Sequence, residues 1–411
     1  MSSERSAPYF YQFLGTHSLL IGLLPFFLPV YLWTRGLGLA GFCLLIGTSG
    51  ISFVLSLGAW QRWAVKWPLR RLITLTFVLE ICLLACVGVV TTIPDILLYQ
   101  TLSSTNSTSD IVLTSVFVGM LNGCYNAFFW TTQRTLFIQQ LGANDAGKQY
   151  GNFQIFVTLF LKVGILTGGF LLENGGFVVL LAMSAGISAI SNLWLYKARG
   201  AATELHHDTD RVSIMGSLRF KDKRSSRPVF AVDGIFLYLE SHFWTLSLFL
   251  VVKQDFTKLG FMVVLLSACF GVLFFMIKNR IDKLAIQRLY QASVCLYFLS
   301  WLIRFTLTGE SQGSELLIAL LVITFFSSFF RLVFNKRFFD IATQAGAVHY
   351  LLLKSYISQW YLGVFFLTMG IALFMFPVET EVAFSTAYLL AAFLSLAYFL
   401  YQGDSSKPDK L

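Results

Sequence analysis

Long apolar runs, separated by short polar connections, dominate the chain from end to end. Each run is close to the roughly 20 residues that an α-helix needs to cross a bilayer. In lipid, such a run satisfies its backbone hydrogen bonds only when it is helical. The pattern predicts an all-α polytopic membrane protein with twelve transmembrane helices. The predicted spans are 13–33, 39–59, 72–93, 111–133, 152–172, 176–196, 229–252, 258–277, 289–308, 315–335, 350–376 and 382–401.

Composition agrees with this pattern. Hydrophobic residues make up 56% of the 411 residues, charged residues only 12%, and the mean hydropathy is +0.71. A soluble domain carries about a quarter charged residues. The first run lacks a small-residue cleavage pattern and is expected to remain as an uncleaved anchor, and Pro25 and Pro29 predict a bend in it. We expect a multi-pass protein of the cell (inner) membrane.

Basic residues gather in alternate connections, and this asymmetry predicts orientation. Connections rich in Lys and Arg face the cytoplasm, so an even number of spans places both termini there. The formal net charge of +9 follows from this asymmetry and suits anionic inner-leaflet lipid, so no nucleic-acid partner is expected. The basic residues of the predicted cytoplasmic side include Arg62, Lys66, Arg70, Arg71, Lys148, Lys278, Arg280, Lys283, Arg288, Lys336 and Arg337.

The longest cytoplasmic connection follows the sixth predicted span and divides the chain. Within it, Val212, Met215 and Leu218 recur at helical spacing among basic residues, which predicts a short helix on the inner membrane surface. The predicted domains are an N-terminal six-helix bundle (1–196), a central loop (197–228), a C-terminal six-helix bundle (229–401) and a cytoplasmic tail (402–411).

The two halves show a weak internal repeat. "FLGTHSLL" aligns with "YLESHFWT" at an offset of 225 residues, which matches His17 with His242. "WTTQRTLFI" aligns with "VFNKRFFDI" at an offset of 203, which matches Arg134 with Arg337. The first and fourth spans thus echo the seventh and tenth, as two six-helix pseudo-repeats require.

Twelve spans, cytoplasmic termini, a basic central loop and parallel halves resemble the major facilitator superfamily of secondary transporters. "GAWQRWAVKWPLRR" follows the second span and has Gly58 and the basic Arg70 and Arg71 where the family has a glycine and a basic cluster. Arg62 stands where the family has an acid, which weakens the expectation of its usual charge-relay gating in this half. The matching loop, "IKNRIDKLAIQR", lacks the tight spacing. The resemblance implies two halves that rock about a site near the midplane.

Ionisable residues within spans are costly in lipid and by default mark a transport pathway. Glu240 lies near the centre of the seventh span and Lys162 near the centre of the fifth. Glu240, His17 and His242 are proton-coupling candidates, because burial moves the pKa of a carboxylate or imidazole. The alternative for each is a satisfied structural group, and this alternative is favoured for Glu80 in the third span.

Polar side chains recur at three-to-four spacing on the fourth, tenth and eleventh spans. This stripe predicts a wet cavity lined by the first, fourth, seventh and tenth spans, and the alternative is hydrogen bonding between helices. Arg134 and Arg337 are inner-gate candidates, expected to pair with carboxylates or helix carbonyls. The cavity candidates are Asn122, Asn126, Trp130, Lys162, Arg331, Tyr356, Gln359 and Trp360.

These features predict a secondary active transporter that moves a small amphiphilic organic solute by alternating access, coupled to protons and working as a monomer. Export is expected from the habit of the family it resembles. A non-transporting receptor or partner protein with this architecture is the alternative. A membrane-embedded enzyme is disfavoured, because zinc, nucleophile-elbow and phosphate-loop motifs are absent from the sequence.

No cofactor or metal framework is expected. All six cysteines fall inside predicted spans, and His206, His207, Asp208 and Asp210 have the character of a solvated linker. Asn106 begins a glycosylation sequon in a predicted outer loop, a short pattern that often arises by chance.

Overall fold

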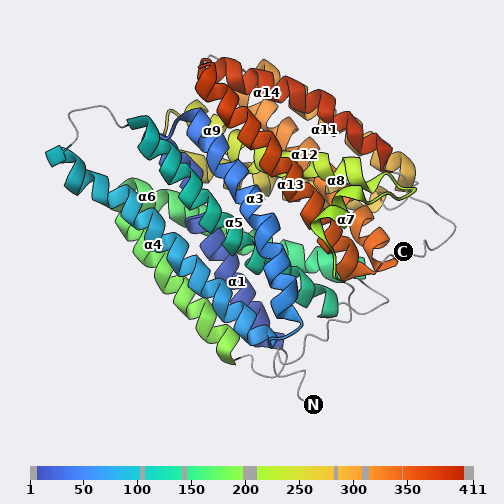
Figure 1. The fold of residues 1–411 in the computed structure, drawn as a ribbon. Coiled ribbons are helices and arrows are strands. Elements are labelled where there is room, and N and C mark those ends of the chain that lie inside the picture. Colours follow the sequence, from blue (N-terminus) through green and yellow to red (C-terminus); the bar gives the residue numbers. More distant parts are fainter. Residues whose placement is uncertain are drawn as a thin grey trace.

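The computed structural model describes the backbone of residues 7–101, 107–140, 146–197, 211–281, 286–307, 314–344 and 346–401. Every element in these ranges is helical, and the long helices run side by side (Figure 1). The elements are α1 Ala7–Leu23, α2 Leu28–Thr34, α3 Gly38–Ala64, α4 Leu69–Thr101, α5 Ser107–Gln140, α6 Ala146–Lys197, α7 Ile214–Arg219, α8 Ser226–Tyr238, η1 Leu239–Phe243, α9 Trp244–Val251, α10 Phe256–Ile281, α11 Ile286–Thr306, α12 Ser314–Gln344, α13 Ala347–Met375, α14 Thr380–Ser395 and η2 Leu396–Leu400.

The all-helical membrane fold is confirmed. Within the described residues, nine helices are long and apolar enough to cross a bilayer, and one of them, Phe156–Trp194, takes in the fifth and sixth predicted spans. The described parts of all twelve predicted spans are mainly helical. That the chain crosses the membrane twelve times stays a prediction. Asn106, His206, His207, Asp208, Asp210 and the tail 402–411 lie outside the described residues.

Four of the predicted spans are interrupted or joined: the first and seventh are interrupted, and the fifth and sixth are joined in α6. The first breaks between α1 and α2, where Pro25 lacks a backbone N–H and its ring crowds the preceding turn. Gly176, in a left-handed conformation (φ 74°), separates the two parts of α6. The seventh contains η1, a π-helical turn that carries both Glu240 and His242.

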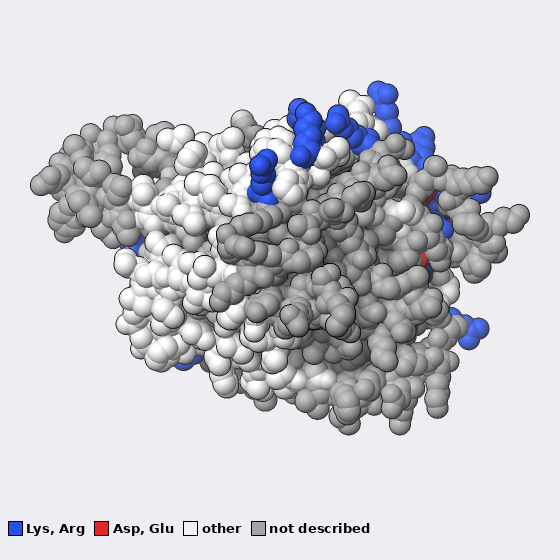
Figure 2. All heavy atoms as spheres, turned by 90° about the horizontal axis from the view of Figure 1, so that it is seen from below, with Lys and Arg blue, Asp and Glu red and all other residues white. Residues whose placement is uncertain are grey.

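Apolar side chains cover much of the outside of the bundle. Leu113 and Met375 are each 69% exposed, and Leu55 is 62% exposed. Among the described residues of the face in Figure 2, those at the left are largely uncharged, and Lys and Arg gather mainly at the upper and right margins. A soluble monomer rarely exposes apolar surface on this scale, whereas a hydrocarbon surrounding favours it.

Glycines allow the helices to approach closely. A Cβ at Gly22 would lie 2.2 Å from the Leu161 carbonyl oxygen, and one at Gly164 would lie 2.1 Å from the Leu19 carbonyl oxygen. α1 and α6 therefore meet backbone to backbone, as small residues permit in membrane bundles. α3 packs along α5 in the same way.

The parts before and after the central loop meet mainly along α3 and α13, which lie next to each other in Figure 1, and along α6 and α10. A Cβ at Gly50 would lie 2.8 Å from the Gln359 carbonyl oxygen, so α3 and α13 also touch through their backbones. Beside them, the Gln61 amide group donates to the Tyr356 hydroxyl at 2.6 Å and exchanges two hydrogen bonds with the backbone of Val212. The expected short helix in the central loop is present as α7, but Val212, just before it, is buried and held by Gln61.

Candidate functional site

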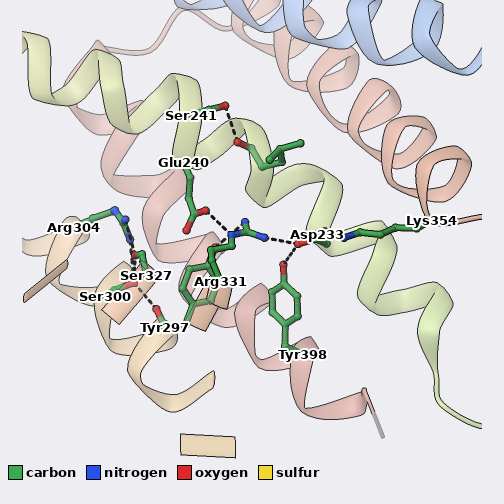
Figure 3. A network of polar contacts seen from close by, with 11 residues as sticks. Asp233, Glu240, Ser241, Tyr297, Ser300, Arg304, Ser327, Arg331, Lys354 and Tyr398 are labelled. Carbon is green, nitrogen blue, oxygen red and sulfur yellow. Dashed lines mark hydrogen bonds and ion pairs between the residues drawn. The ribbon is translucent and has the colours of Figure 1, made fainter. Parts of the chain in front are cut away.

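Arg331 on α12 lies at the centre of a polar network inside the C-terminal half. Its Nε donates to Glu240 Oε2 at 2.7 Å, and its Nη1 donates to Asp233 Oδ1 at 2.5 Å (Figure 3). Asp233 on α8 and Glu240 in η1 are seven residues apart, close to two helical turns, so both carboxylates reach the same guanidinium. The structure thus brings together two predicted residues, Glu240 and Arg331.

Asp233 has further partners. Lys354 Nζ on α13 lies 3.0 Å from its Oδ2, and the Tyr398 hydroxyl donates to its Oδ1 at 2.8 Å. Sequence reasoning missed Asp233, Lys354 and Tyr398 as site residues. The seven-residue spacing from Asp233 to Glu240 was a usable signal, whereas nothing local in the sequence connects Lys354 or Tyr398 to it.

Arg304 on α11 is a second buried guanidinium that sequence reasoning missed. Its Nη1 donates to Ser300 Oγ at 3.0 Å, and its Nη2 donates to Ser327 Oγ at 2.9 Å. The guanidinium lies 4.7 Å from the ring centre of Trp244 and 4.3 Å from that of Trp301, both cation–π distances. No carboxylate is within ion-pair distance of Arg304 among the residues described.

His17 belongs to a separate, fully buried cluster in the N-terminal half. The Tyr125 hydroxyl donates to Glu80 Oε1 at 3.1 Å and lies 3.1 Å from His17 Nε2. Ser188 also donates to Glu80, at 2.7 Å, and the His17 ring stacks on Phe129. His17 is 1% exposed, and none of its described contacts is with a residue of the Arg331 network.

His242, its repeat partner, has a different environment. Its ring stacks on that of Tyr238 with centroids 4.6 Å apart, and its Nδ1 lies 2.7 Å from Ser241 Oγ. His242 and Glu240 share the turn η1, but no bond between them is found in this described turn.

The polar stripe on α5 bonds largely to itself. Asn122 donates to Ser49 Oγ, Asn126 donates to Asn122 Oδ1 and Trp130 Nε1 donates to Asn126 Oδ1, each at 3.0 Å. All three stripe residues are half-buried, so one interhelical bond coexists with a partly accessible polar face. The partly accessible face fits the predicted cavity, and the bond to Ser49 fits the alternative of hydrogen bonding between helices.

The remaining cavity candidates are spread more widely. Tyr356 and Gln359 on α13 are buried, at 2% and 8% exposure, and Trp360 is half-buried. Lys162 on α6 is half-buried, and no ion pair joins it to Glu240 among the described residues, where Arg331 binds that carboxylate.

The two repeat-matched arginines are not equivalent. Arg134 is exposed, with its guanidinium 5.7 Å from the Trp130 ring centre. Arg337 is 6% exposed, donates to Gln287 Oε1 at 2.9 Å and lies 4.2 Å from the Tyr290 ring centre. The expected carboxylate partner is replaced, for Arg337, by an amide oxygen and an aromatic face.

Solved structures of two transporters share this architecture. The chain is similar to the nucleoside transporter NupG, with a TM-score of 0.68 and 13% identity over 97% of this chain and 100% of that one. It is also similar to the human organic anion transporter MFSD10 (TETRAN), with a TM-score of 0.58 and 15% identity over 97% of this chain and 99% of that one.

Searches with protein-family models and against curated protein sequences find no match. At such low identity the structural likeness establishes the fold alone. Both neighbours are transporters of the major facilitator superfamily, so the fold that the resemblance implied is confirmed. The chain is therefore an integral, multi-pass membrane protein with the fold of the major facilitator superfamily transporters.

Proposed function

We propose that this protein is a secondary active transporter that moves a small amphiphilic organic solute by alternating access and couples this movement to protons. The observation that carries the proposal is the Arg331 network. The side chains of Arg331, Glu240 and Lys354 are 21%, 19% and 16% exposed, so they lie inside apolar helices yet remain partly accessible. Charged groups are retained at this depth where they serve a solute or ion pathway.

Alternating access is supported by how the two parts of the chain meet. The contact runs along α3 with α13 and α6 with α10, while the Arg331 network lies wholly on the C-terminal side. Asn122, Asn126 and Trp130 offer the N-terminal counterpart on α5, with Lys162 on α6. A solute held between these groups would be exposed to either side as the parts rock.

Proton coupling is assigned to Glu240. Its carboxylate faces Arg331 directly. The other charged or titratable groups of the network are Asp233, Tyr297, Arg304, Lys354 and Tyr398. Protonation of Glu240 removes one partner of Arg331 and changes which conformation the network favours. His17 and His242 are the alternative coupling residues.

The two structural neighbours bear on the solute class. One is called a nucleoside transporter and the other an organic anion transporter, and both classes of solute are small, polar and organic. An amphiphilic solute suits a site that combines charged groups with the rings of Tyr297 and Phe330 near Arg331. Three further points stay predictions. They are that the protein exports its solute, that it lies among the lipids of the inner membrane, and that it acts as a monomer.

The test is a flux measurement in proteoliposomes with the solute that best stabilises the purified protein in a thermal-shift screen. Glu240→Gln keeps the shape of the side chain and fixes its neutral state. We expect the variant to lose gradient-driven accumulation of the solute while retaining downhill exchange. Glu315→Gln, at an exposed carboxylate in the first turn of α12, is the matched control and should behave as wild type.

Each alternative has its own outcome in this assay. Full uphill transport by Glu240→Gln would return coupling to His17 or His242. Binding of a solute without any flux would favour a non-transporting receptor, and chemical conversion of the solute would favour an enzyme. Inverting the proton gradient in the same vesicles reports the direction of transport.

A further inference from the structure

The charges of the Arg331 network do not balance. Its described charged residues are three cations, Arg304, Arg331 and Lys354, and two carboxylates, Asp233 and Glu240. Asp233 is shared between Arg331 and Lys354, and Glu240 binds Arg331 directly. Arg304 makes its hydrogen bonds to hydroxyl groups instead. The network therefore holds one positive charge more than its carboxylates neutralise.

Arg304 is the origin of this excess. It is 3% exposed, and its Nε is a buried donor without a hydrogen-bond partner in the described structure. Glu240 Oε1 is likewise buried and unpartnered, and this carboxylate lies within electrostatic range of both arginines. The Glu240 carboxylate thus interacts electrostatically with two guanidinium groups. A buried ion without a full counter-charge is costly, and the two tryptophan rings offset only part of that cost.

The accessible donors lie elsewhere in the network. Arg304 is buried, whereas Arg331 and Lys354 are partly exposed. Arg331 Nη2 makes only a long contact, 3.5 Å to the Tyr297 hydroxyl. A guanidinium has five N–H donors and an ammonium has three, so both groups retain hydrogens for a further acceptor. Arg134, from the N-terminal half, lies within electrostatic range of Lys354 and adds positive charge.

We infer that the solute of this transporter carries a negative charge, in the form of a carboxylate or a similar oxyanion, bound by Arg331 and Lys354. Arg304 supplies the uncompensated positive charge that the solute neutralises. Charge-assisted hydrogen bonds from guanidinium and ammonium groups to oxyanions are among the stronger polar contacts in proteins. This inference rests on the proposed transport function and narrows its solute class.

The test compares matched probes on the purified full-length protein in detergent. Thermal stabilisation is titrated with benzoate and benzamide, with hexanoate and hexanamide, and with benzylamine. In each pair the carboxylate should bind about tenfold more tightly than its amide, because only the carboxylate brings a negative charge to these cationic donors. Benzylamine should bind more weakly than either aromatic partner, since it adds positive charge to the site.

Two variants assign the effect to Arg304. Arg304→Gln removes the excess charge and should bring the carboxylate-to-amide ratio close to one. Arg304→Lys retains the charge and should keep most of the preference. The wild-type comparison needs no substitution, so the inference stays testable even where Arg304→Gln does not fold. Each variant is titrated only as the monodisperse fraction from size exclusion.

Several results would overturn the inference. They are equal or tighter binding of the amides or the amine, no stabilisation by any carboxylate, or an unchanged preference in folded Arg304→Gln. The titration is repeated with phosphatidylglycerol in the micelle, because loss of carboxylate binding there would identify a lipid phosphate as the anion. Proteoliposome flux of a neutral or cationic solute would refute only the charge assignment and leave the transport function standing.

Discussion

At the residue scale, charged groups in the spans differ sharply in their surroundings. Arg331 has two carboxylate partners and Arg304 has hydroxyl and aromatic partners, although both are arginines in apolar helices. Glu80 is held by Tyr125 and Ser188, which supports the structural interpretation favoured for it from the sequence. Position in a span indicates that a charge is costly, but its partners determine what the charge can do.

A residue-scale prediction concerns Arg134 and Arg337. Arg134 is exposed and lies within electrostatic range of Lys354 across the contact between the halves. Arg134→Ala should therefore shift the balance between conformations more than it changes solute affinity. The readout is the reactivity of single cysteines on either side of the membrane, measured beside a binding titration. A change in affinity alone would place Arg134 in the binding site.

Arg337 supplies the contrast for this experiment. Its guanidinium is nearly buried against Tyr290 and is bonded to Gln287. Because removal leaves an amide and an aromatic face without their partner, Arg337→Ala should mainly lower the thermal midpoint of the protein. The sequence repeat matched the two residues but carried no information on this difference in burial.

At the element scale, close contact between helices depends on glycines at particular crossings. A Cβ at Gly123 on α5 would lie 2.2 Å from the Ser49 carbonyl oxygen of α3. A Cβ at Gly186 on α6 would meet nothing within 4 Å. Both residues are glycines in apolar helices, so the sequence does not distinguish them. Only the helix packed opposite shows which one is sterically required.

This contrast gives a prediction with its own control. Gly123→Ala should destabilise the protein by about 1–3 kcal/mol, the usual cost of overpacking a close contact. Gly186→Ala should be neutral or stabilising by up to about 1 kcal/mol, because alanine favours the helix. Thermal unfolding in detergent measures both. Equal midpoints for the two variants would contradict the close α3–α5 contact.

At the scale of the whole molecule, the fold places its charged network in one half and a polar stripe in the other. The α3–α13 contact joins the two parts along their lengths, and Gln61 ties the central loop to this contact by bonding both Val212 and Tyr356. A movement of one half against the other must rearrange these bonds. The connection between the halves is thus part of the structure that alternating access would change.

The predicted topology is tested at the same scale. Single cysteines at Ser104, outside the described residues, and at Ser225, just before α8, should react with an impermeant maleimide from opposite sides of the membrane. The six native cysteines are replaced first. Reaction of both positions from the same side would refute the twelve-span arrangement and the parallel halves with it.

The sequence by itself indicated that the chain lies in lipid, that its apolar runs are helical and which family it resembles. Hydropathy and run length are local properties, and a bilayer requires both of any segment that crosses it. The sequence also singled out Glu240 and Arg331, but not Asp233, Arg304 or Lys354, although all five are ionisable residues within predicted spans. Only the tertiary structure decided that Glu240 and Arg331 meet, across 91 positions of sequence, and that Asp233 joins them across 98. Pairing depends on which helix faces align, and that depends on packing along the whole chain.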